Sequence, residues 1–184
     1  LAEQLFRVNE FSYTRIKFGV QLMLWGAFKK MVIADRAAVL VDNAFGFPET
    51  FGGTYVAAAA LAYAIQIYGD FSGGIDIATG AAQIFGVTLD KNFERPYLAT
   101  SIPDYWRRWH MTLGGWFRDY LYIPLGGNRV KPIRHVFNIL VVWAATGFWH
   151  GASWNFIFWG LLYAVLLLFE KYILHPKRRH AVFM

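Results

Sequence analysis

The stretch VFNILVVWAATGFWHGASWNFIFWGLLYAVLLL, residues 136–168, decides the fold class of this chain. It contains two apolar segments, residues 136–149 and 154–168, separated only by HGAS. Apolar runs with so short a break predict a helical hairpin, and basic residues flank both of its outer ends. Because basic loops tend to stay in the cytoplasm, both outer ends are expected on the cytoplasmic side of a membrane.

Composition supports the same setting for the whole chain. The sequence is 57% hydrophobic, 19% aromatic and only 16% charged, whereas soluble domains carry about 25% charged residues. No nucleic-acid-binding motif accompanies the net charge of +6, so we interpret the basicity as membrane orientation and contact with anionic lipids, and expect no nucleic acid as a partner. The absence of cysteine excludes disulfides and thiolate chemistry.

Two earlier apolar segments, residues 18–34 and 54–69, complete the set of four. All four are shorter than the ~20 residues that cross a bilayer upright, so we expect several of them to be interrupted, extended by polar turns or only partly spanning. The second runs into GDFSGGID, where Asp70 and Asp76 adjoin apolar sequence. Carboxylates in such a place are costly, and pairing with a charge on another helix is their favoured role.

The stretch SIPDYWRRWHMTLGGWFRDYLYIPLGGNR, residues 101–129, is the part most typical of a site. Ser101 and Asp104 form an S-x-x-D capping box, which predicts a helix starting there. Aromatic and apolar residues then recur at helical spacing and are expected on one face: Trp106, Trp109, Leu113, Trp116 and Tyr120. The glycines of PLGGNR, residues 124–129, predict a turn.

His150 is a candidate catalytic residue, because a histidine inside a membrane costs free energy unless it is paired or hydrated. Neutral imidazole accepts a proton from a hydroxyl near pH 7 and returns it later. A histidine in a tight hairpin also serves by hydrogen-bonding the turn, and the residues alone favour neither role. For His110 they favour a polar anchor, and His135, His175 and His180 are expected at the membrane interface.

Other chemistries fail on spacing. The sequence has no H-E-x-x-H, P-loop or dinucleotide-binding pattern, and no metal site is expected. Neither His110 nor His150 is followed by the aspartate that soluble glycerolipid-type acyltransferases require. GDFSGG matches neither the nucleophile turn of serine proteases nor G-x-S-x-G.

The motifs taken together resemble the membrane-bound O-acyltransferase family, in its bacterial branch related to the alginate O-acetylation protein. The resemblance is carried by YGDFSGGIDIATGAAQIFG (68–86), NFERPYLATSIPDYWRRWHMTLGGWFRDYLYIPLGGNR (92–129) and TGFWHGASWNFIFWGLLYA (146–164), and more weakly by residues 18–42. One departure is visible, because the family commonly has F-S-G-Y-S-D where this chain has FSGGID. Asp76, the carboxylate that remains there, is counted among the expected binding residues.

The resemblance implies transfer of an acyl group, most often acetyl, from a cytoplasmic thioester towards a hydroxyl on an extracytoplasmic glycan or carrier protein. Acetyl-coenzyme A or an acyl carrier protein thioester is the expected donor, with no permanently bound cofactor. The W-H-G histidine, here His150, is the expected base, and His110 is the second candidate. The two histidines either cooperate in one step or serve successive half-reactions.

Residues beside these histidines have expected roles too. Arg107, Arg108 and Arg118 are expected to hold the donor's phosphates by charge-assisted hydrogen bonds, with contact to lipid headgroups as the structural alternative. Trp106, Trp109 and Trp149 are expected to wall the passage.

The resemblance also implies a fold, a location and partners. We expect an all-α, multi-pass protein of the bacterial cell membrane, with short and slanted helices around a central cavity. Residues 1–184 are expected to be part of a single membrane domain, with further helices before residue 1 and after residue 184. Expected partners are membrane lipids, an extracytoplasmic O-acetyltransferase or glycan acceptor, and an acyl carrier protein. D-alanyl transfer to teichoic acid and a non-catalytic membrane conduit stay open as alternatives.

Overall fold

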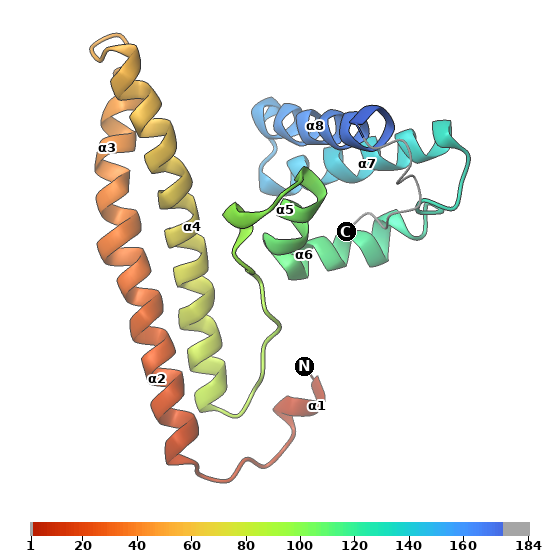
Figure 1. The fold of residues 1–184 in the computed structure, drawn as a ribbon. Helices are drawn as coiled ribbons and strands as arrows, with labels where there is room; N and C mark the ends of the chain where they lie inside the picture. The colour runs from red at the N-terminus through yellow and green to blue at the C-terminus, as the bar shows by residue number, and fades with distance from the viewer. Residues whose placement is uncertain (1, 175–184) are drawn as a thin grey trace. The chain divides into compact units, whose positions relative to one another are not determined.

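The computed structural model describes residues 2–174, and every regular element in that range is a helix (Figure 1). The predicted all-α class is therefore confirmed for this part of the chain. The chain divides between Asp90 and Lys91 into two compact units, which are described separately. His175 and His180 lie outside the described residues.

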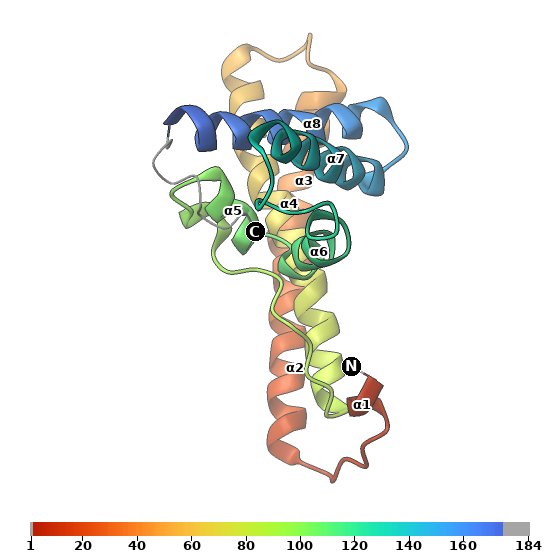
Figure 2. The ribbon, with the colours of Figure 1, turned by 90° about the vertical axis from the view of Figure 1, so that its right-hand side faces the viewer.

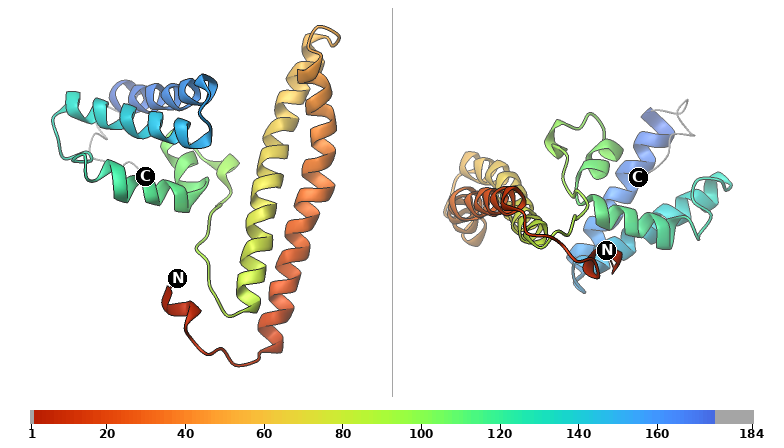
Figure 3. Two further views of the ribbon diagram at one scale, coloured as in Figure 1. Left: turned by 180° about the vertical axis from the view of Figure 1, so that it is seen from behind. Right: turned by 90° about the horizontal axis from the view of Figure 1, so that it is seen from below.

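The first unit is a long helical hairpin. Its elements are α1 (Ala2–Leu5), α2 (Tyr13–Phe28), the π-helix η1 (Lys29–Ala34), α3 (Asp35–Gly46) and α4 (Gly53–Ile84). Helix α2 continues through η1 into α3, and the continuous helix lies along α4 (Figures 1 and 3). The apolar segment 54–69 is not interrupted. Helix α4 runs unbroken from it through GDFSGGID, so polar sequence extends this segment within one helix.

Glycines of α4 and α2 let the two helices of the hairpin approach closely. A Cβ on Gly26 would lie 2.5 Å from the carbonyl oxygen of Gly73, and one on Gly80 would lie 2.5 Å from that of Gly19. Small residues at such a contact bring backbones together and increase dispersion contacts, which drives helix association where the hydrophobic effect is weak. These glycines therefore form a packing surface and not a loop.

Two ion pairs tie the helices of the hairpin together. Lys29 Nζ lies 2.7 Å from Asp76 Oδ2 and donates to Ser72 Oγ at 2.9 Å. Lys30 Nζ lies 2.6 Å from Asp70 Oδ1. The favoured structural role of both carboxylates, pairing with a charge on another helix, is confirmed.

The second unit begins with shorter elements and ends with a helical hairpin. Its elements are η2 (Pro96–Leu98), α5 (Ile102–Arg108), α6 (Met111–Phe117), η3 (Arg118–Tyr122), α7 (Pro132–His150), α8 (Trp154–Phe169) and η4 (Glu170–Leu174). Helices α7 and α8 lie side by side (Figure 2), which confirms the hairpin and its HGAS turn. By length and composition, one helix in the described part of the chain could cross a membrane, residues Trp154–Leu174.

The single helix predicted from Ser101 is broken. Its start is correct, because the Ser101 side chain accepts a hydrogen bond from the Asp104 backbone N–H. The helix stops at Arg108, however, and His110 adopts the left-handed region with φ 46° before α6 begins. The segment before η2 causes the break, because the N–H of Met111 donates to the Asn92 carbonyl and that of Glu94 to the Arg108 carbonyl.

The core of the second unit lies where α7 meets α8 and the α6–η3 helix. It contains Phe117, Tyr122, Ile139, Val142, Trp143, Ala164 and Leu167. His135 is buried at the same place, 2% exposed, with Nε2 3.1 Å from the Tyr122 hydroxyl and Nδ1 3.1 Å from the Tyr172 hydroxyl. His135 is therefore the centre of a buried polar cluster, and its expected place at the membrane interface stays a prediction.

Candidate functional site

His150 is the last residue of α7, and its own helix orients its ring. Nδ1 lies 2.8 Å from the carbonyl oxygen of Thr146, one helical turn earlier. A carbonyl oxygen only accepts, so in the neutral ring Nδ1 carries the hydrogen and Nε2 carries the lone pair. His150 is thereby prepared to accept a proton at Nε2.

His110 is oriented by a residue far from it in sequence. Its Nδ1 lies 3.0 Å from the side-chain oxygen of Asn92, which also accepts the Thr112 hydroxyl at 2.7 Å. Asn92 is only 9% exposed. An amide oxygen accepts, so this contact also puts the hydrogen on Nδ1 and the lone pair on Nε2.

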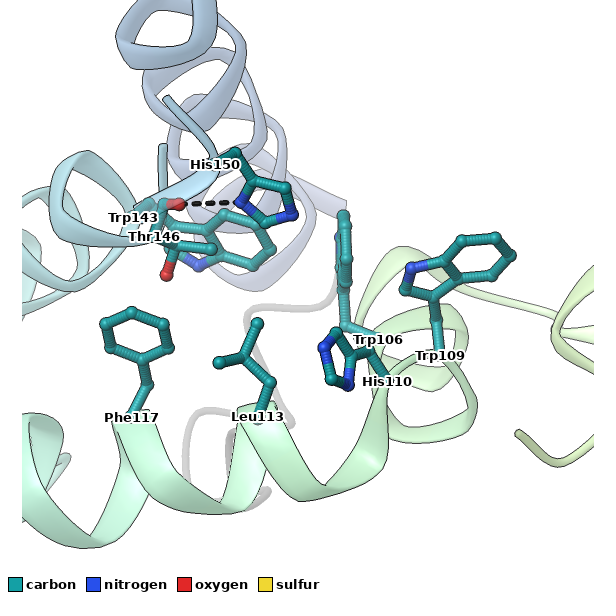
Figure 4. A pocket seen from close by; sticks show the side chains of 9 residues that line it. Trp106, Trp109, His110, Leu113, Phe117, Trp143, Thr146 and His150 are labelled. Carbon is teal, nitrogen blue, oxygen red and sulfur yellow. Dashed lines mark hydrogen bonds between the residues drawn. The ribbon is translucent and has the colours of Figure 1, made fainter. Parts of the chain in front are cut away.

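The two histidines line one small cavity, of about 40 Å³. Figure 4 shows Leu113 and Phe117 of α6 on one side of it, facing His150 and Trp143 of α7. The full lining consists of Trp106, Trp109, His110, Leu113, Gly114, Phe117, Trp143, Thr146 and His150. The fold thus brings His110 and His150, the two predicted catalytic residues, to one cavity although they lie forty positions apart in sequence.

Apolar walls set the electrostatics of this cavity. Its lining contains neither aspartate nor glutamate. His110 lies between two seven-residue helices that are too short to span a membrane. Burial lowers the pKa of His110 to about 4, with a smaller contribution from the nearby His150. His110 is therefore neutral near pH 7.

The predicted tryptophans fall into different surroundings. Trp106 packs edge-on against Trp143 with ring centroids 4.8 Å apart, and Trp109 stacks on Tyr105 at 5.7 Å. Trp149 lies outside the lining, but its ring is 6.0 Å from that of His110 and 5.0 Å from that of His150. Trp106 and Trp109 therefore form walls of the cavity, and Trp149 flanks both histidines.

The three predicted arginines are all paired with aspartates. Arg107 and Arg108 both contact Asp104, at 3.5 and 3.0 Å. Arg118 makes two hydrogen bonds to the adjacent Asp119, at 2.8 and 3.1 Å. Their role in donor binding stays a prediction.

Arg118 also lines a second, more open cavity of about 540 Å³, together with Arg129 and the glycine turn of PLGGNR. The predicted turn is confirmed, with φ of 102° at Gly126 and 55° at Gly127. Buried Asn138 of α7 fixes this turn by donating to the carbonyls of Leu125 and Gly127, each at 3.1 Å. The α6–η3 helix lines both cavities, with Phe117 in the wall of the first and the adjacent Arg118 in the wall of the second.

Asp76 belongs to the first unit, where it pairs with Lys29. This contact neither supports nor opposes the binding role expected for it, which stays a prediction.

Sequence reasoning missed several residues that shape the site. Trp143 and Thr146 precede His150 by seven and four residues, so helical spacing puts them on its face of α7, a signal the sequence does contain. Asn92 gives no such signal, because its contact with His110 comes from the path of the chain and not from a local pattern. The same holds for Asn138.

Comparison with known proteins identifies the family to which this chain belongs. Residues 2–182 match the model of MBOAT, the membrane-bound O-acyltransferase family. The chain belongs to this family, which confirms the resemblance drawn from the motifs.

Individual relatives are similar over most of the chain. The peptidoglycan O-acetyltransferase of Helicobacter pylori is 44% identical over 91% of this chain and 32% of its own length. The probable alginate O-acetylase of Pseudomonas aeruginosa is 40% identical over 89% of this chain and 32% of its own. The teichoic acid D-alanyltransferase of Bacillus subtilis is 34% identical over 60% of this chain and 31% of its own. The chain thus spans about a third of the length of these relatives.

Proposed function

We propose that the full-length protein is a membrane O-acyltransferase that moves an acetyl group from a cytoplasmic thioester to a hydroxyl of an extracytoplasmic polysaccharide. The observation that carries the proposal is the orientation of His150, whose Nδ1–H is held by the Thr146 carbonyl while Nε2 keeps its lone pair at an apolar cavity. Membership of the family supports the reaction class. Relatives named for peptidoglycan, alginate and teichoic acid support a cell-surface polymer as acceptor.

His150 acts as the general base. Nε2 takes the proton of the acceptor hydroxyl while the hydroxyl oxygen attacks the thioester carbonyl carbon. When the tetrahedral intermediate collapses, the C–S bond breaks and the same proton goes to the leaving sulfur. His110, neutral and fixed by Asn92, positions the reacting groups on the other side of the cavity.

The cavity favours acetyl over D-alanyl as the transferred group. A volume of about 40 Å³ suits a small group. D-alanyl carries an ammonium, which would lie among apolar walls without a carboxylate to pair with, and burying an unpaired charge is strongly unfavourable. The higher identity to the two relatives named for O-acetylation, 44% and 40% against 34%, points the same way.

The donor enters from the cytoplasmic side. Lys131 and Arg134 lie at the start of α7, close in sequence to Arg129, which lines the larger cavity. Basic residues beside apolar helices favour the cytoplasmic side, so we place this cavity at the cytoplasmic end of the unit. Acetyl-coenzyme A or an acyl carrier protein thioester carries phosphates that guanidinium groups bind well. The protein accordingly resides in the bacterial cell membrane as a multi-pass protein, with lipids, a thioester donor and a glycan acceptor as its partners.

The test replaces His150 in the full-length gene and measures ester-linked acetate on the cell-surface polysaccharide. His150→Asn is the informative change, because an amide N–H near the place of Nδ1 can still donate to Thr146, whereas no group is left to take the proton. We expect acetate to be lost at unchanged membrane abundance. Ser153→Ala is the matched control in the same turn, since Ser153 is exposed and its side chain caps nothing.

The outcomes separate the alternatives. Retained acetate in His150→Asn would rule out His150 as the base and favour a non-catalytic conduit. If mild base released D-alanine instead of acetate from the polysaccharide, the transferred group would be D-alanyl and not acetyl. Loss in both His150→Asn and Ser153→Ala would mean that the turn itself is needed, whatever the chemistry of the imidazole.

A further inference from the structure

Two indole N–H groups beside the histidines have no hydrogen-bond partner among the described residues. They are Nε1 of Trp106 and Nε1 of Trp143, and both atoms are buried. Tryptophan nitrogen is a donor only, and a buried indole N–H usually finds an acceptor. An unsatisfied buried donor costs free energy, so a pair of them at one place requires an explanation.

Both indoles belong to the wall of the cavity that His150 lines. Trp143 is 2% exposed, and it shares a face of α7 with His150, two helical turns later. Figure 4 shows the Trp143 indole and the His150 imidazole on the α7 side of the cavity, opposite Leu113 and Phe117. Both unpaired donors thus belong to side chains that wall the same small cavity as His150.

We infer that Trp143, assisted by Trp106, binds the carbonyl oxygen of the thioester and stabilises the oxyanion formed when the acceptor attacks. This inference rests on the proposed function and assigns a catalytic residue to it. The new C–O bond forms at the carbonyl carbon while the π electron pair moves to the oxygen, where the indole N–H groups donate to it. The pair returns when the C–S bond breaks, and His150 gives the hydroxyl proton to the sulfur.

Rigid donors suit this role. The Trp143 ring is fixed by three aromatic neighbours on two other helices. The ring centroids of Trp106 in α5 and of Trp159 and Tyr163 in α8 lie at 4.8, 6.4 and 5.6 Å. A donor that is already in place needs no reorganisation when charge develops, and an apolar wall strengthens its hydrogen bond. The energetic cost of leaving the N–H groups unpaired in the protein alone is recovered when the oxyanion accepts from them.

The test removes the N–H without changing the shape of the ring. In the full-length protein, 3-benzothienylalanine, in which sulfur replaces the indole N–H, is introduced at residue 143 by codon suppression. The same replacement at Trp159 is the matched control, because that indole belongs to the same aromatic cluster but not to the cavity wall. The rate at which ester-linked acetate appears on the polysaccharide, per amount of protein, and the thermal midpoint are measured for both.

We expect the rate to fall at least tenfold at residue 143 and less than twofold at residue 159, because removing one oxyanion donor typically costs about 10²–10³ in kcat. The thermal midpoint of the residue 143 variant should not fall, since the N–H it loses is unpaired. A rate within twofold of wild type at residue 143, an equal loss at residue 159, or a loss accompanied by a lower midpoint would each overturn the inference. Absence of ester-linked acetate from wild-type cells would instead overturn the proposed function itself.

Discussion

Replacing Gly73 by alanine should loosen the hairpin of the first unit, whereas replacing the next residue, Gly74, should not. Both lie in the middle of α4, but they face different surroundings. A Cβ on Gly73 would lie 2.7 Å from the carbonyl oxygen of Gly26, whereas one on Gly74 would meet nothing within 4 Å. The two substitutions add the same methyl group to adjacent positions of one helix.

The expected magnitude follows from the contact at Gly73. Ordinary carbon to oxygen contacts begin near 3.3 Å, so the helices must separate by roughly 0.6 Å, and the atoms that resist are backbone atoms of α2 that cannot rotate away. Overpacking of this kind costs about 1–3 kcal/mol. The gain in helix propensity, up to about 1 kcal/mol, is common to both alanines and cancels in the comparison.

The thermal midpoint of the full-length protein in detergent or nanodiscs measures this difference. About 1 kcal/mol shifts the midpoint by about 2–4 °C in a domain of about 150–250 residues and by less in a longer protein, so Gly73→Ala should melt a few degrees below Gly74→Ala. Gly26→Ala, on the other side of the contact, should behave like Gly73→Ala. Equal midpoints for Gly73→Ala and Gly74→Ala would refute the close glycine contact as the basis of the hairpin.

Three further results are expected. Lys29→Met and Asp76→Asn should each destabilise the protein, but together by less than their sum, with a coupling of about 0.5–3 kcal/mol in a double-mutant cycle of thermal midpoints. Asn92→Ala should cost about 1–3 kcal/mol and slow acyl transfer, because donors of His110 and Thr112 lose their acceptor; an unchanged transfer rate would contradict its positioning role. The Arg108 guanidinium holds the pKa of Asp104 below its ordinary value. The ionised Asp104 therefore stabilises the folded protein above the pKa of the unfolded chain, near about 3.9, and this stabilisation is lost as the pH falls through the pKa of Asp104 in the folded protein. The midpoint advantage of wild type over Asp104→Asn should therefore be constant from pH 5 to 7 and shrink below about pH 4.

Features that rest on local patterns could be predicted from the sequence. The hairpin around HGAS, the Ser101 cap and the PLGGNR turn each depend on residues within a few positions of one another, and all three are present. Interhelix pairing of the carboxylates in GDFSGGID was also foreseeable, because a charge beside apolar sequence requires a partner.

The break at His110 could not be predicted in that way. Helical spacing continues across it, and no glycine or proline marks the place. The helix ends because backbone groups of the segment at Asn92 take the hydrogen bonds that α5 would otherwise continue. Tertiary contacts thus override a local preference, and a single sequence carries no trace of which distant segment will do so.

The two histidines of the site are consequently supported in different ways, and this difference has a physical consequence. His150 is held by a carbonyl of its own helix, so its orientation persists as long as the last turn of α7 forms. His110 is held by Asn92, eighteen positions away, so its orientation exists only when the extended segment before η2 is in place. A perturbation of that segment should therefore displace His110 while leaving the hydrogen bond of His150 intact. The cavity between them depends on tertiary packing on one side and on local helix geometry on the other.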